Sequence, residues 1–159
     1  MKKLILVAFL AGSVGFIAGN AFWYLASPLW IDQVVDESIS QSETAQILAR
    51  GTFSDADAAH RGSGTATIFQ GTDGQRTLRL SDFEVTNGPD LEVWLVAAAD
   101  ITASSDVTES EWLALGQLKG NIGDQNYDIP ADADLSKYNS VVIWCEQFGV
   151  LFSPASLLR

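Results

Sequence analysis

The sequence is poor in the residues that most often bind metals or form disulfide bonds. It contains one cysteine, Cys145, one histidine, His60, and one methionine, Met1. A single thiol excludes an intrachain disulfide, a structural zinc site of several cysteines and an iron–sulfur cluster. The sequence also lacks a Cys-x-x-Cys-His motif, which excludes covalent c-type haem. We therefore predict no metal centre of these kinds. Any thiol chemistry would have to use Cys145.

Basic residues are also scarce. Nine lysines and arginines stand against twenty aspartates and glutamates, which gives the chain a net charge of −11. All the acidic residues follow residue 31, whereas Lys2 and Lys3 come before it, so the chain after residue 31 carries a net charge of −13. Such a surface repels phosphate backbones and anionic lipid headgroups. We expect no nucleic-acid partner.

The stretch from Leu4 to Ile31 has no charged side chain. It is longer than the ~20 apolar residues that a helix needs to cross a bilayer, so residues 1–31 are predicted to be a membrane anchor. Lysines before the stretch and acidic residues after it favour a cytoplasmic N-terminus. The protein would then lie in the cell membrane with a single span, and its remainder would be periplasmic or extracellular. The alternative is a signal peptide cleaved near Ala21.

The rest of the chain divides by composition. Residues 32–49 are polar, acidic and free of glycine and proline, which predicts a partly helical stalk or linker. Residues 50–159 contain many short alternating segments separated by turn signals. Examples are the segments 64–70, 76–80, 91–97, 112–118, 126–129 and 141–148. This pattern predicts an all-β domain, a single antiparallel β-sandwich or barrel.

Cys145 ends the apolar segment Ser140-Val-Val-Ile-Trp-Cys. In a strand, Val141, Ile143 and Cys145 would point to one face, and Val142 and Trp144 to the other. Both faces are apolar, which predicts a central strand covered on both sides. Charge returns directly after Cys145, so this position is compatible with a half-buried thiol at a pocket or edge. A lone thiol in an oxidising compartment is either a small apolar core residue or is retained for chemistry.

The order of these segments resembles the DM-thirteen family, a small extracellular module of Skeletor-type proteins. The resemblance covers about residues 50–157. It is carried mainly by Gly51-Thr-Phe53, Asn87-Gly-Pro-Asp-Leu91, Leu118-Lys-Gly120, Gly123-Asp-Gln125 and Val141-Val-Ile-Trp-Cys145. The Gly-Pro-Asp-Leu block followed by the Trp-Cys strand is its most specific part.

The resemblance implies an electron-transfer or redox module in which Cys145 acts as a bare thiol or as a ligand to a prosthetic group such as haem. The animal members often carry a cytochrome-like redox domain, whereas this chain offers only the predicted anchor. A redox partner would therefore be a separate protein. His60 is the single imidazole available as a second ligand, and it would serve only if the fold brings it to Cys145. A solvated loop histidine is the alternative.

The sequence contains no catalytic constellation. No Gly-x-Ser-x-Gly motif surrounds any serine, and the acidic residues form no pair with a distinctive spacing. The question of enzymatic activity stays open, and this absence favours a component that is not an enzyme by itself. Trp94, Trp112 and Trp144 would line a ligand pocket or pack in the core. A non-catalytic module that binds a protein or a glycan at the cell surface is the alternative function.

Overall fold

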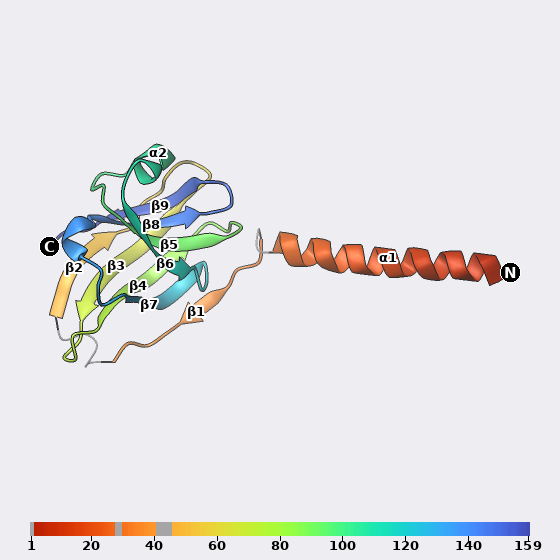
Figure 1. Ribbon diagram of the computed structural model, residues 1–159, viewed down its shortest axis with the longest axis horizontal. Helices are drawn as coiled ribbons and strands as arrows, with labels where there is room; N and C mark the ends of the chain where they lie inside the picture. Colours follow the sequence, from red (N-terminus) through yellow and green to blue (C-terminus); the bar gives the residue numbers. More distant parts are fainter. Residues whose placement is uncertain (1, 28–29, 41–45) are drawn as a thin grey trace. The chain divides into compact units, whose positions relative to one another are not determined.

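The computed structural model describes residues 2–27, 30–40 and 46–159 (Figure 1). It divides into two compact units, Met1–Ile31 and Asp32–Arg159.

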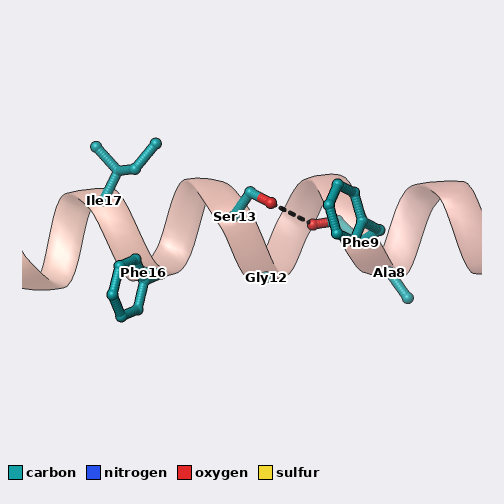
Figure 2. Close-up of a pocket in the computed structure, with 6 residues that line it drawn as sticks. All are labelled: Ala8, Phe9, Gly12, Ser13, Phe16 and Ile17. Atoms are coloured by element: carbon teal, nitrogen blue, oxygen red, sulfur yellow. Dashed lines mark hydrogen bonds between the residues drawn. The ribbon is translucent and has the colours of Figure 1, made fainter.

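The first unit is dominated by one helix, α1 (Lys2–Ala26). Its segment Lys2–Trp23 is long and apolar enough to cross a membrane, as the sequence predicted. Two polar side chains within the helix bond to its own backbone: Ser13 Oγ donates to the carbonyl of Phe9 and Asn20 Nδ2 to that of Phe16. Figure 2 shows the first bond beside a shallow groove on the helix surface. Internal bonding of this kind lowers the cost of placing polar groups in lipid.

The second unit is a β-sandwich, which confirms the predicted fold class. One sheet has the strand order β1-β7-β4-β3-β2 and the other the order β6-β5-β8-β9. The strands are β1 (Val34–Asp36), β2 (Gln46–Thr52), β3 (Gly62–Gln70), β4 (Arg76–Val85), β5 (Leu91–Val96), β6 (Trp112–Gln117), β7 (Ile122–Ile129), β8 (Ser140–Cys145) and β9 (Val150–Ser156). All pairings are antiparallel except that of β1 with β7.

Two groups of buried side chains cover the two faces of the second sheet. The group between the sheets takes Leu78 and Leu80 from β4 and Val93 and Ile143 from β5 and β8. The group on the outer face contains the side chains of Trp94, Val96, Ile101, Val107, Val142, Trp144 and Leu151. Ile101 and Val107 come from the connection between β5 and β6, which contains α2 (Ser104–Thr108). The connection is polar in sequence, but these two apolar side chains hold it against the sheet.

The segment predicted as a partly helical stalk is different in the structure. Its described residues contain no helix, and the segment supplies β1 and the beginning of β2; residues 41–45 lie outside the described part. Asp32 Oδ1 accepts hydrogen bonds from the side-chain amides of Asn87 and Asn121, at 2.8 and 2.9 Å. The Glu37 carboxylate pairs with Lys119 Nζ at 2.9 Å. These long-range polar contacts hold the segment along β7 and replace the local bonds of a helix.

Other differences are local. The predicted segment 76–80 extends to Val85 in β4, whose register with β7 shifts around Asp82, a residue with a positive φ of 48°. A short 3-10 helix, η2 (Leu135–Lys137), precedes β8. Asp134 caps it, because its carboxylate accepts from the Ser136 backbone N–H.

Candidate functional site

β8 lies between β5 and β9 and is buried along its whole length. Val141, Ile143 and Cys145 face the group between the sheets, while Val142 and Trp144 face the outer group. The predicted alternation and the predicted central strand are both confirmed. The reason is that β-branched and aromatic side chains on both sides of one segment can be satisfied only by cover on both sides.

Cys145 is the last residue of β8, opposite Leu91 of β5 and Val150 of β9. Its side chain has 0% exposed surface. The thiol donates a hydrogen bond to the Pro89 carbonyl, with Sγ 3.0 Å from the oxygen. The thiol is therefore not half-buried: the turn that follows β4 folds over the end of β8 and closes it.

A backbone hydrogen bond joins the turn before β5 to the turn after β8, next to Cys145. The backbone N–H of Glu146 donates to the carbonyl of Asp90 at 3.1 Å, and that of Gly149 to the carbonyl of Cys145 at 2.9 Å. A Cβ placed on Gly88 would lie 2.5 Å from Phe152 Cζ, so the turn packs directly against this ring. Asp90 follows with a positive φ of 52°, which reverses the chain into β5. The turn of residues 87–90 thus has a structural role, because it brings the Pro89 carbonyl to Cys145.

Carboxylates surround the end of β8. Asp90, Glu92 and Glu146 each place an oxygen within 4.8 Å of the others. Their mutual repulsion, chiefly from Glu92, raises the pKa of Glu146. Burial raises the pKa of the Cys145 thiol and the Asp90 charge raises it further, while backbone N–H groups of Phe148 and Gln147 oppose the change. The thiol is therefore protonated at neutral pH.

His60 lies in the loop between β2 and β3. Its Nδ1 is 2.8 Å from Asp57 Oδ2, and its ring packs on Phe152 with the ring centres 4.4 Å apart. Phe152 thus contacts both His60 and the Gly88 position. The imidazole is therefore held by the contact with the Asp57 carboxylate and by packing on the Phe152 ring.

Comparison with known families decides the relationship. A family model described as electron transfer DM13 matches residues 52–157. The chain belongs to the DM-thirteen family. The match takes in every strand from β3 to β9, and with them Cys145 and the turn that closes over it. Comparison with curated proteins and with solved structures finds no match.

A haem ligated by Cys145 would need the sulfur to face an open cavity with its lone pairs free. In the DM-thirteen domain the Cys145 side chain has no exposed surface and its sulfur contacts the Pro89 carbonyl. The closed surroundings of Cys145 therefore do not fit a haem.

The buried, protonated thiol gives a direct prediction for alkylation. We expect a maleimide reagent to label Cys145 far more slowly in the native DM-thirteen domain than in the unfolded chain, because the thiolate is the nucleophile and needs access. Raising the pH through the ordinary value of 9.0 should accelerate labelling of the unfolded chain before that of the native domain. Because the pKa of the Cys145 thiol is higher in the native domain than in the unfolded chain, the protonated thiol stabilises the fold below pH 9.0. This stabilisation is lost as the pH rises past the native pKa. The prediction would be contradicted if the native domain and the unfolded chain were labelled at the same rate, both at pH 7 and at pH 9.

Sequence reasoning missed two features of the site. The first is the Pro89 carbonyl, whose role depends on a contact between residues 56 positions apart. The second is the hydrogen bond from Trp94 Nε1 to Glu92 Oε2, at 2.7 Å. The second had a visible signal, because residues i and i+2 of a strand share one face.

Proposed function

We propose that this DM-thirteen domain is an electron-transfer module whose working group is the Cys145 thiol, held at a membrane by α1. The family relationship supports the general role. The observation that carries the specific role is the complete burial of a lone thiol that keeps a polar contact to Pro89. Burial disfavours thiol–disulfide exchange, because the attacking sulfur must reach its partner directly. An electron can leave without such contact.

The proposed step is a one-electron oxidation. The sulfur–hydrogen bond of Cys145 breaks, an electron passes to a protein that accepts one electron, and the proton passes to solvent. A thiyl radical remains, and return of an electron and a proton restores the thiol. The raised pKa of Cys145 means that the resting form is the thiol, so electron and proton leave together.

The remaining parts of the proposal concern placement. Residues 1–31 form the anchor, residues 32–49 connect it and residues 50–159 carry the activity. The N-terminus is cytoplasmic and the domain is periplasmic or extracellular, which Lys2 and Lys3 at the N-terminal end of α1 and the acidic chain after it support. The redox partner is a separate protein, and the net charge of −13 after residue 31 favours one with a basic surface.

The test is a redox titration of the full chain in nanodiscs, with Cys145→Ser as the variant and Ser153→Ala as a control at another buried position. We expect the wild type and the control to reduce a soluble one-electron acceptor, and Cys145→Ser to lose this reaction. If Cys145→Ser reduces the acceptor as well as the wild type, Cys145 is not the working group. If the wild type does not reduce the acceptor, the non-catalytic binding module is the better account.

A further inference from the structure

Three tryptophans form a continuous row of ring contacts on the outer side of the second sheet. They come from β6, β5 and β8, which are neighbours in that sheet. The ring centres of Trp112 and Trp94 are 4.1 Å apart with their planes 15° from parallel. Those of Trp94 and Trp144 are 5.5 Å apart at 34°. The first pair is stacked and the second is tilted, and both lie at contact distance for packed aromatic rings.

The stack runs from solvent to the interior. Trp112 is 46% exposed, whereas Trp94 and Trp144 are 5% and 3% exposed. Trp144 is bonded through the backbone of β8 to the next residue, Cys145, whose side chain lies on the opposite face. The stack therefore begins where a soluble oxidant can touch an indole and ends one peptide unit from the buried sulfur.

The middle member has a fixed proton acceptor. Trp94 Nε1 donates to Glu92 Oε2 at 2.7 Å, along the same strand. An indole that loses an electron has a far more acidic N–H than the neutral ring, and a carboxylate already bonded to that N–H can accept the proton. A buried indole N–H needs an acceptor in any core, and here the acceptor is a group that can also act as a base.

We propose that Trp112, Trp94 and Trp144 form a one-electron relay between the surface and the interior of β8. A one-electron oxidant in solution removes an electron from Trp112, and Trp94 returns one to it. The Trp94 N–H proton passes to the Glu92 carboxylate, which leaves a neutral radical on Trp94, a carboxylic acid on Glu92 and a reduced oxidant. Trp144 then gives an electron to the Trp94 radical, and the proton returns from Glu92 to Trp94 Nε1. The last transfer, from Cys145 to Trp144, rests on the proposed function.

The test uses the full chain in nanodiscs with Trp23 and Trp30 replaced by phenylalanine, so that the relay residues are the tryptophans that remain. Photogenerated tris-bipyridine ruthenium in its oxidised form is the oxidant, and transient absorption follows the tryptophan radicals. We expect Trp112→Phe to lower the radical yield several-fold, because it removes the exposed end. It also leaves the buried core unchanged. Glu92→Gln should shift the spectrum from the neutral radical to the radical cation, whereas Glu111→Gln, whose carboxylate bonds Lys137, should not.

An unchanged radical yield in Trp112→Phe, together with an unchanged spectrum in Glu92→Gln, would overturn the relay. Thiol content after each flash series separates the two proposals. If tryptophan radicals form as expected and the Cys145 thiol survives, the relay stands and the proposed role of Cys145 fails. If the thiol is lost at the wild-type rate in both Trp112→Phe and Trp144→Phe, the electron from Cys145 leaves by another route and the relay to the sulfur is refuted.

Discussion

Replacing Phe152 by alanine is expected to lower the free energy of unfolding by about 3–5 kcal/mol, the usual cost of removing a buried aromatic ring. Phe152 is buried in the group of side chains between the sheets. Its ring also supports the turn that carries Pro89, since the Gly88 position packs directly on it. Loss of the ring should therefore increase native labelling of Cys145 as well as reduce stability.

Phe148→Ala is the matched control. Phe148 lies in the turn after β8, closer in sequence to Cys145, but its side chain is 64% exposed. We expect a change in unfolding free energy within about 0.5 kcal/mol, as is usual for exposed positions. Chemical denaturation of both variants gives the energies, and maleimide labelling gives the access to the thiol. Similar effects from the two variants would contradict the assigned role of Phe152.

Replacing Gly123 by alanine is expected to detach β1 from β7. Gly123 has a φ of +100°, and a Cβ there would collide with the carbonyl oxygen of Val35. Strain in this backbone region costs roughly 1–3 kcal/mol for a residue other than glycine, and the collision adds to it. Because the obstructing atom belongs to the β1 backbone, the strand must move away. Hydrogen exchange should then show loss of protection in Val34–Asp36.

Gly74→Ala separates the two causes. Gly74 has a φ of +86° in the turn between β3 and β4, and a Cβ there would meet open space. It should show the cost of backbone strain without the collision, and β1 should keep its protection. If both variants lose the same stability and retain β1, the contact between Gly123 and Val35 does not hold the segment.

The sequence was sufficient for the local features of the sandwich. The hairpin of β3 and β4 follows from two alternating segments joined by a turn with Gly71 and Gly74. The position of β8 at the centre of its sheet follows from apolar residues on both faces. These features depend on neighbours along the chain and on the period of two, which a single sequence displays.

Features that depend on distant contacts were not predictable in this way. β1 is held by Asn121 and Lys119, which lie more than 80 positions from Asp32 and Glu37. The burial of Cys145 depends on the turn at Pro89, and the alternation of β8 alone leaves its end open. The position of His60 depends in part on Phe152 of β9. In each case an irregular segment is positioned by tertiary contacts, and the period of a strand carries no information on them.

The most direct measurement of the central claim is a count of thiols against electrons in the wild-type chain. The protein in nanodiscs is mixed with a one-electron acceptor, samples are unfolded at intervals, and the remaining Cys145 thiol is titrated beside the reduced acceptor. We predict that thiol disappears in proportion to the acceptor reduced, and that a reductant restores it. Reduction of the acceptor with the thiol intact, or no reduction at all, would contradict the account.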